Sequence, residues 1–212
     1  MIWVVNLIHR IVRWLTFRNI RVKYRARIGD LKRRGMKVGK NVIISPSARI
    51  DENYPYLISI GNNCVIGPNV RLLTHDSTLN MFNGNYMKVA RITIKDNCVI
   101  SMNSTILPGV TIGPDVLVAT GSVVNKDIPP NTCVAGVPAR YYGKFSDLIE
   151  RSRNEIKSGI QFEAVDLARD MDEKDKKRKK KIIQAAERGP VFIKGFEAKN
   201  PVWLEGVEIK NK

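Results

Sequence analysis

The chain has 212 residues, 43% of them hydrophobic, with three cysteines and a net charge of +16. That length fits one domain with appendages, and the apolar share is enough to bury a core, which excludes wholesale disorder. Three cysteines with no CxxC pair exclude a disulfide framework and favour a location in the reducing cytoplasm. If the N-terminal segment binds lipid, we expect the protein at the inner face of the membrane.

The positive charge is concentrated at the start of the chain. Residues 1–40 hold 12 Lys and Arg against one acid, whereas residues 41–141 hold seven bases and six acids. At helical spacing, the basic residues in residues 2–17 fall on one face and apolar side chains cover the rest. This pattern predicts a basic amphipathic helix within an arm at residues 1–37. Such a helix either lies on an anionic membrane surface or packs against protein, and the sequence favours neither. Because basic residues interrupt the apolar run, we expect neither a membrane span nor a signal peptide.

A six-residue period organises the middle of the chain. Aliphatic side chains fall six apart, and the residue four positions after each is small or branched, so both positions point inward. Gly, Pro, Asn and Asp fill the places between and turn the chain. A helix needs a period of about 3.6 and a sandwich a period of about 2, so this ladder excludes both. The aliphatic positions are Val38, Ile44, Ile50, Ile60, Ile66, Leu72, Ile94, Ile100, Ile106, Ile112, Val118 and Val124.

Each hexad is therefore one short strand and one corner. Three hexads make one triangular coil, and the twelve hexads make four coils whose strands stack in parallel about 4.8 Å apart. We predict an all-β solenoid, a parallel β-helix, over residues 38–142. It is flanked by the arm at residues 1–37 and by a tail at residues 143–212.

The last part of the repeat carries a more specific signature, the stretch GSVVNKDIPPNTCVAGVPAR from Gly121 to Arg140. The repeat and this stretch resemble the hexapeptide-repeat acyltransferases, a family that includes galactoside and maltose acetyltransferases and polysaccharide O-acetyltransferases. The resemblance covers roughly residues 38–142. It implies a left-handed parallel β-helix, a homotrimer, acetyl-coenzyme A as the acetyl donor and a sugar as the acceptor.

The ladder is interrupted between Leu72 and Ile94, where 22 residues replace the expected six, so 16 residues leave the solenoid as a loop. Loops on a rigid scaffold are favoured sites of function. His75, one of only two histidines, stands at the root of this loop. Acyl transfer from a thioester to a hydroxyl needs a base that works near neutral pH, and histidine suits that role. The resembling family has its catalytic histidine at a similar loop, so we predict that His75 is the general base.

Two residues of the loop are predicted to contact the acceptor. Asp76 follows His75 directly, and adjacent strand residues point to opposite faces, so a substrate contact and a solvated corner are both open. Asn85 is suited to hydrogen-bond a sugar hydroxyl, although polar loop residues need no function.

The resemblance also implies where the donor binds, in a groove between neighbouring β-helices beside the last coils. Carried over by position, it assigns Ser101 and Asn103 to the thiol end of the coenzyme and Thr120 to the pantetheine. It assigns Lys126 and Arg140 to the nucleotide phosphates, which call for cations. These two residues are also open to a reading as ordinary surface charges.

Other chemistries are disfavoured by the residues present. Cys64 and Cys98 occupy inward positions, so we expect no cysteine nucleophile and a direct transfer without an acyl-enzyme. A carbonic anhydrase on the same fold needs three histidines for each metal site, and this chain has two, so we expect no metal.

The tail is predicted to be helical and partly extended. The stretch FSDLIERSRNEIK has a helical pattern, which makes helical appendages at both ends of the solenoid the expectation. The charged run at residues 173–183 is typical of a solvated helix or linker and does not favour nucleic-acid binding. Residues 190–209 are apolar enough for a strand or two.

Three functions stay open. The first is an O-acetyltransferase that moves acetyl from acetyl-coenzyme A to a sugar hydroxyl in surface polysaccharide biosynthesis. An N-acetyltransferase of an amino or nucleotide-linked sugar would use the same histidine. A β-helix that serves only as an assembly scaffold would bind no coenzyme and would be unaffected by His75→Ala.

Overall fold

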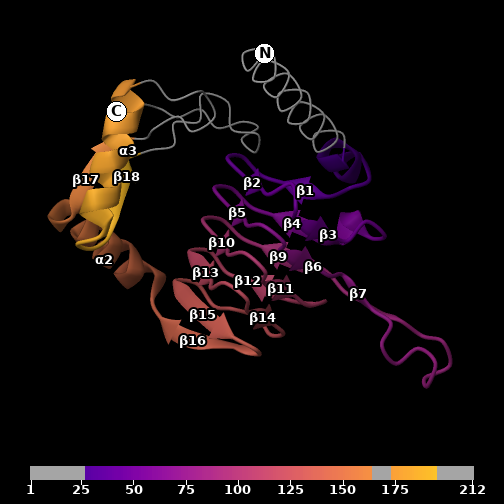
Figure 1. Cartoon of the computed structure of the whole chain (residues 1–212). Helices are drawn as coiled ribbons and strands as arrows, with labels where there is room; N and C mark the ends of the chain where they lie inside the picture. Colours follow the sequence, from indigo (N-terminus) through magenta and orange to yellow (C-terminus); the bar gives the residue numbers. More distant parts are fainter. Residues whose placement is uncertain (1–26, 164–172, 195–212) are drawn as a thin grey trace, which may run out of the picture. The chain divides into compact units, whose positions relative to one another are not determined.

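The computed structural model describes residues 27–163 and 173–194 (Figure 1). Contacts divide the chain into two compact units, one that runs to Phe145 and one from Ser146 to Pro201. The first unit contains the repeat. The amphipathic segment predicted at residues 2–17 lies outside the described residues. In the described part of the chain, no helix combines the length and the apolar character needed to cross a membrane.

The first unit consists of three sheets that the chain visits in turn. Sheet A contains β1 (Lys37–Val38), β4 (Ile58–Ile60), β9 (Ile92–Ile94) and β12 (Thr111–Ile112). Sheet B contains β2 (Ile43–Ile44), β5 (Val65–Ile66), β10 (Val99–Ile100), β13 (Val116–Val118), β15 (Thr132–Gly136) and β16 (Ala139–Gly143). Sheet C contains β3 (Arg49–Ile50), β6 (Arg71–Leu72), β11 (Thr105–Ile106) and β14 (Val123–Val124).

The strand pairings confirm the parallel stacking that the hexads predicted. Val65 of β5 pairs with Val99 of β10, which pairs with Leu117 of β13, and the other two sheets follow the same pattern. The antiparallel pairing of β15 with β16 ends sheet B. Because each circuit passes through sheets A, B and C, the strands of the first unit enclose a three-sided column (Figure 1).

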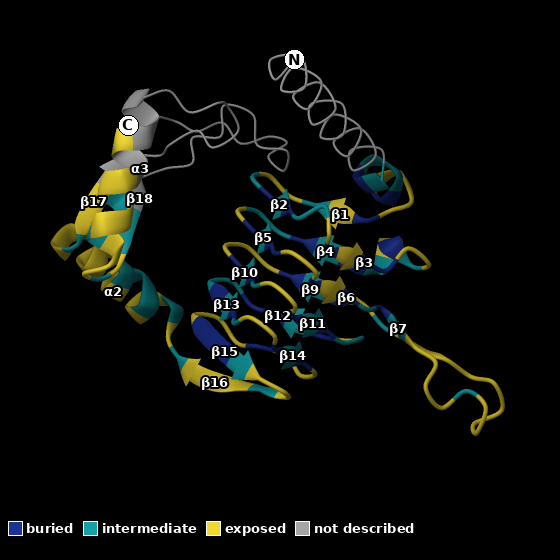
Figure 2. Cartoon of the chain, viewed as in Figure 1, coloured by how far each residue is buried: buried dark blue, intermediate teal, exposed yellow. Residues whose placement is uncertain are grey.

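The interior of this column is filled by the two inward positions of each hexad (Figure 2). Ile66, Ile100 and Ile106 of the aliphatic ladder are fully buried. Cys64 and Cys98, which stand four positions after the ladder residues Ile60 and Ile94, are fully buried as well. Burying a large aliphatic side chain contributes about 1.5–3 kcal/mol, so this stack is the main favourable contribution to folding of the column. The predicted direction of these side chains is confirmed.

A ladder of amides lines the corner between sheets A and B. Asn41, Asn63, Asn97 and Asp115 occupy equivalent places in four successive coils, with φ between 54° and 59°. Each amide donates to the next side-chain oxygen: Asn41 to Asn63 at 3.1 Å, Asn63 to Asn97 at 3.0 Å, and Asn97 to Asp115 at 2.9 Å. Asn and Asp tolerate this left-handed conformation better than other side chains, which explains why they recur at this corner.

The column is interrupted twice, both times at the corner between sheets C and A. After β3, the chain forms a short 3-10 helix at Pro55–Leu57 before it enters β4. After β6, it forms a hairpin of β7 (His75–Asp76) with β8 (Lys88–Val89), and the loop between these strands projects away from the column (Figure 1). Most of the projecting loop is exposed (Figure 2).

Residues 27–33 form a helix that precedes β1, with Ile28 and Leu31 buried in the core of the column. The second unit contains α2 (Phe145–Ser158) apart from its first residue, α3 (Glu173–Ala186) and the parallel pair β17 (Ile160–Glu163) and β18 (Val191–Lys194). The helix expected from FSDLIERSRNEIK is α2, and the charged run lies in α3. Of the strands expected in residues 190–209, β18 pairs with β17, and residues 195–209 lie outside the described residues.

Candidate active site

His75 stands at the first position of β7, where the chain leaves the column. Its backbone pairs with Val89 of β8, and its side chain is 28% exposed. The ring of Tyr54 meets the imidazole edge to face, with the two ring centroids 5.7 Å apart. The imidazole is therefore in contact with Tyr54 and partly open to solvent.

The Nδ1 atom of His75 lies 2.5 Å from Oδ2 of Asp51, a residue of the preceding coil. The Asp51 side chain is only 2% exposed. The same Oδ2 accepts hydrogen bonds from the backbone amide of Thr74 at 3.0 Å and from the Thr74 hydroxyl at 2.6 Å. Its other oxygen, Oδ1, accepts from the backbone amide of Asn53 at 3.0 Å. Asp51 is thus a buried carboxylate with both oxygens occupied.

The charge state of Asp51 follows from these contacts. Burial raises its pKa, but the hydrogen bonds from the Thr74 hydroxyl, the Asn53 amide, His75 and the Thr74 amide together lower the pKa below its ordinary value of 3.8. The carboxylate is therefore ionised at neutral pH and acts only as an acceptor.

An ionised acceptor beside Nδ1 selects the tautomer of His75 that carries its proton on Nδ1. The unprotonated nitrogen is then Nε2, on the side of the ring away from Asp51. An unprotonated imidazole nitrogen in a partly open site is equipped to accept a proton from a bound hydroxyl or amine.

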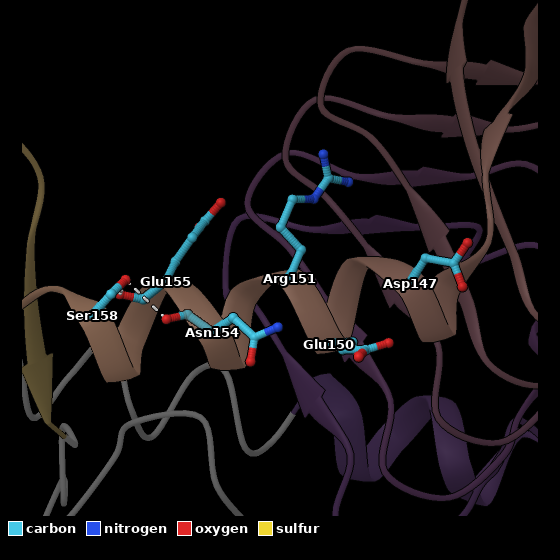
Figure 3. Close-up of a pocket in the computed structure, with 6 residues that line it drawn as sticks. All are labelled: Asp147, Glu150, Arg151, Asn154, Glu155 and Ser158. Carbon is cyan, nitrogen blue, oxygen red and sulfur yellow. Dashed lines mark hydrogen bonds between the residues drawn. The ribbon is translucent and has the colours of Figure 1, made fainter.

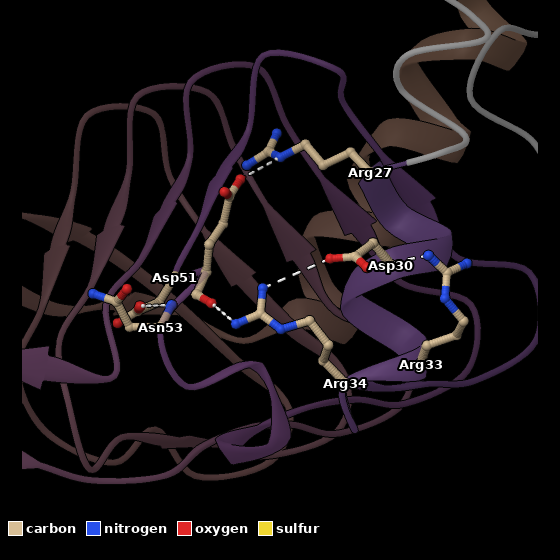
Figure 4. A network of polar contacts seen from close by, with 7 residues as sticks. Arg27, Asp30, Arg33, Arg34, Asp51 and Asn53 are labelled. Atoms are coloured by element: carbon tan, nitrogen blue, oxygen red, sulfur yellow. Dashed lines mark hydrogen bonds and ion pairs between the residues drawn. The ribbon is translucent and has the colours of Figure 1, made fainter.

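The residues around Asp51 are fixed to the helix at residues 27–33 (Figure 4). Arg27 donates to the carboxylate of Glu52 at 2.8 Å and to the backbone carbonyl of Ala48 at 3.0 Å. Arg34 donates to the backbone carbonyl of Glu52 at 2.5 Å. Two arginines of the predicted basic arm therefore hold the segment that carries Asp51.

Asp76 and Asn85 make contacts of a different kind. The Asp76 carboxylate accepts from the amide and the hydroxyl of Thr78, and the hydroxyl is the main reason that its pKa is lowered. Its side chain is exposed and makes no hydrogen bond to His75. Asn85 has φ of 67°, and its backbone N–H donates to the backbone carbonyl of Asn80 at 2.7 Å. The geometry of this turn explains why an Asn stands there.

The residues predicted to bind the donor fall into two groups on the column. Ser101, Asn103 and Thr120 lie at the corner between sheets B and C, in two successive coils. Lys126 lies at the corner between sheets C and A, on the same side as His75 but two coils further along. Within one chain, sheet C separates the first group from His75.

Arg140 lies in β16 at the end of the column. Its side chain is exposed, and its guanidinium donates to the backbone carbonyl of Ala139 at 3.0 Å. It remains available for an additional anionic partner, because a guanidinium carries five donors.

The three cysteines are free and buried inside the first unit. Cys98 is fully buried, and its hydrogen bond with Cys64 together with burial raises the pKa of its thiol. The Cys98 thiol also donates to the backbone carbonyl of Gly113 at 3.0 Å. In the described residues, no three His, Cys, Asp or Glu side chains gather in a way that could hold a metal.

A hollow also runs along α2 in the second unit (Figure 3). It is lined by Asp147, Glu150, Arg151, Asn154, Glu155 and Ser158. All six come from one helix, and none is a predicted site residue.

Asp51 is the residue of the candidate site that the sequence interpretation missed. A signal existed, because ten residues separate Ile50 from Ile60 where the ladder predicts six. This shorter interruption begins one coil before the interruption that carries His75, at the same corner. Two interruptions stacked at one corner bring residues near their starts, Asp51 and His75, together.

The repeat agrees with comparisons to known proteins. Residues 91–126 match the family model described as bacterial transferase hexapeptide, six repeats. The chain therefore carries the hexapeptide repeat of bacterial transferases, and proteins with which it shares sequence similarity are named as acetyltransferases.

Two curated relatives illustrate the similarity. A putative acetyltransferase of Bacillus subtilis, YvoF, is 34% identical over 116 residues, which is 55% of this chain and 64% of the relative. The galactoside O-acetyltransferase of Escherichia coli is 37% identical over 110 residues, or 52% of this chain and 54% of the relative. The match thus spans less than two thirds of each relative.

Among solved structures, a hexapeptide-repeat acetyltransferase of Vibrio cholerae crystallised with acetyl-coenzyme A is 25% identical. The alignment covers 61% of this chain and 85% of that chain, with a TM-score of 0.47.

Proposed function

We propose that this protein is an O-acetyltransferase that moves acetyl from acetyl-coenzyme A to a hydroxyl of a sugar, with His75 as the general base. The observation that carries the proposal is the contact of His75 Nδ1 with the buried carboxylate of Asp51, which leaves Nε2 free. The hexapeptide repeat and the similarity to a galactoside O-acetyltransferase support the acetyl-transfer chemistry.

In the proposed reaction, Nε2 of His75 removes the proton of the acceptor hydroxyl as its oxygen attacks the thioester carbonyl. The new C–O bond forms, the C–S bond breaks, and the thiolate receives the proton that His75 had taken up. Asp51 stabilises the positively charged imidazole while it holds that proton. The buried thiols are not needed, so transfer is direct.

The donor site is proposed to lie between two copies of the chain. Ser101, Asn103 and Thr120 lie on a different corner from His75, so a neighbouring copy placed alongside would bring its group toward this histidine. This arrangement is the homotrimer that the family resemblance implies. Lys126 and Arg140, both exposed, would bind the nucleotide phosphates.

The remaining parts of the proposal rest on the resemblance and on the sequence. We propose that the column is left-handed and that residues 38–142 form the catalytic domain, between the arm at residues 1–37 and the tail at residues 143–212. Asp76 and Asn85 would contact the acceptor. A cytoplasmic location and a role in surface polysaccharide biosynthesis would suit peripheral contact of the arm with an anionic membrane.

Radiolabelled acetyl-coenzyme A and a panel of sugar and amino-sugar acceptors test the proposal. We expect label on a hydroxyl, and a loss of roughly 10²- to 10⁴-fold in kcat for His75→Ala, the typical contribution of a general base. His9→Ala is the matched control and should keep full activity. Acetyl-coenzyme A should still raise the Tm of His75→Ala, because that residue acts on the proton and not on donor binding.

Two other outcomes would favour one of the two alternative functions. Label found only on amino groups would make the protein an N-acetyltransferase that uses the same base. No change in Tm with acetyl-coenzyme A, together with no transfer, would favour the assembly scaffold and refute the proposal.

A further inference from the structure

The three outer faces of the column differ in chemistry. The outward residues in register are Lys37, Ser59, Thr93 and Thr111 on sheet A, Ile43, Val65, Val99 and Leu117 on sheet B, and Arg49, Arg71, Thr105 and Val123 on sheet C. On sheet C, two adjacent positions in register carry positively charged side chains, Arg49 and Arg71.

Arg49 and Arg71 are direct partners in the pairing of β3 with β6, and both are exposed. Neighbouring parallel strands lie about 4.8 Å apart, so the two side chains leave the sheet next to each other. Like charges placed opposite each other across strands are destabilising. An anion between or above the two guanidinium groups would relieve this repulsion.

No acid of the described residues supplies that anion. Neither arginine forms an ion pair within the described ranges, and the acids nearest in sequence have other partners. Glu52 is paired with Arg27, and Asp51 is bonded to Thr74 and His75.

The arginine pair lies on the same outward side as the catalytic base. Along β6 and into β7, exposed or half-exposed Arg71, Leu73 and His75 alternate with buried Leu72 and Thr74. Four residues of extended chain place Arg71 about 13 Å from His75. That distance is longer than one sugar ring, so an acceptor with its hydroxyl at His75 would reach the arginines with a neighbouring sugar unit.

We propose that Arg49 and Arg71 bind a carboxylate or phosphate of the acceptor, so that the substrate is an acidic glycan. This inference rests on the proposed acetyl transfer and names the class of its acceptor. Arginine is suited to the role because its planar guanidinium binds carboxylate and phosphate through two parallel hydrogen bonds. The phosphates of coenzyme A are the competing source of an anion. However, the predicted donor residues lie in the third and later coils, whereas the arginine pair lies in the first two.

Matched acceptors that differ only in charge test the inference. Oligogalacturonate and hyaluronan oligosaccharides are compared, as acceptors of labelled acetyl, with their carboxamide forms, which are neutral and gain no hydroxyl. The wild-type protein should show a higher kcat/KM for the acidic forms, with a preference that falls as salt is added. Arg49→Gln together with Arg71→Gln should reduce that preference by roughly tenfold or more, since hydrogen bonds between charged groups contribute about that much each.

Lys37→Gln with Lys95→Gln is the control, because it removes the same charge from exposed positions of sheet A and its adjoining corner. This variant should retain the preference. If the arginine variant raises KM for acetyl-coenzyme A and keeps the acceptor preference, the pair serves the donor and the inference is wrong. If acidic acceptors receive no more acetyl than neutral ones while acetyl-coenzyme A raises the Tm, the inference fails and the proposed function stands. Absence of any effect of acetyl-coenzyme A refutes the proposed function itself.

Discussion

Oδ2 of Asp51 lies 2.5 Å from Nδ1 of His75, although 24 residues separate the two in the chain. The contact forms because both residues lie near the start of an interruption at the same corner, in successive coils. It orients the imidazole and provides a fixed negative charge for the positive imidazole of the proposed transition state.

Asp51→Asn should therefore lower kcat while KM for acetyl-coenzyme A stays unchanged. A hydrogen bond to a charged partner contributes about 1.5–3 kcal/mol, which corresponds to a loss of roughly 10- to 100-fold. Steady-state kinetics with both substrates varied measures this. Asp96→Asn is the control, since Asp96 bonds to Asn62 at the corner between sheets A and B and should leave kcat within twofold (about 0.4 kcal/mol). Equal losses in both variants would contradict a specific role for Asp51.

The same carboxylate predicts how stability changes with pH. The pKa of Asp51 is lower in the folded protein than its ordinary value of 3.8, so its ionised form stabilises the fold. That contribution is fully present above the ordinary pKa and is lost as the pH falls through the lower pKa of the folded state. The Tm difference between the wild type and Asp51→Asn, measured from neutral pH to about pH 2, should therefore shrink below about pH 4. A difference that grows toward acid pH would reverse the assigned direction of the shift.

The sequence predicts the column well because each hexad repeats one packing requirement. Ile66 and Ile100 must point inward in the same way in successive coils. The direction of one side chain therefore predicts the direction of the equivalent side chain in the next coil. The contact of Arg34 with Glu52 has no such regularity. Arg34 lies outside the repeat, and its long side chain reaches a backbone carbonyl at one interruption. The separation of Ser101 from His75 by sheet C depends on the corner that each residue occupies, and the six-residue period alone does not state that corner.

The contacts of Arg34 lead to a prediction about the basic arm (Figure 4). Arg34 donates to the carbonyl of Glu52, next to Asp51, and forms an ion pair of 3.6 Å with Asp30. Arg34→Ala should release this segment and lower kcat by roughly 2- to 10-fold, the range that one ordinary hydrogen bond supplies. Arg34→Lys retains a donor and should recover part of the activity.

Arg33→Ala is the control for this measurement. Arg33 is the last residue of the same helix and pairs with Asp30 at 3.1 Å, but its side chain is 73% exposed and does not contact the segment of Asp51. Circular dichroism establishes that both variants are folded at the assay temperature. Identical kinetics of Arg33→Ala and Arg34→Ala would show that the contact with Glu52 has no influence on the reaction.

The amide ladder between sheets A and B leads to a prediction about stability. Asn97 donates to Asp115, accepts from Asn63, and holds φ of 59°. Asn97→Ala removes both hydrogen bonds and places a Cβ without polar compensation in the left-handed region, which costs about 1–2 kcal/mol by itself. With about 0.5–1.5 kcal/mol for each of the two bonds, the free energy of unfolding should fall by roughly 2–5 kcal/mol. Asn97→Gly loses the same bonds but avoids the backbone strain, so urea denaturation should find it more stable than Asn97→Ala. The opposite order would mean that the left-handed backbone at this corner is not what selects asparagine.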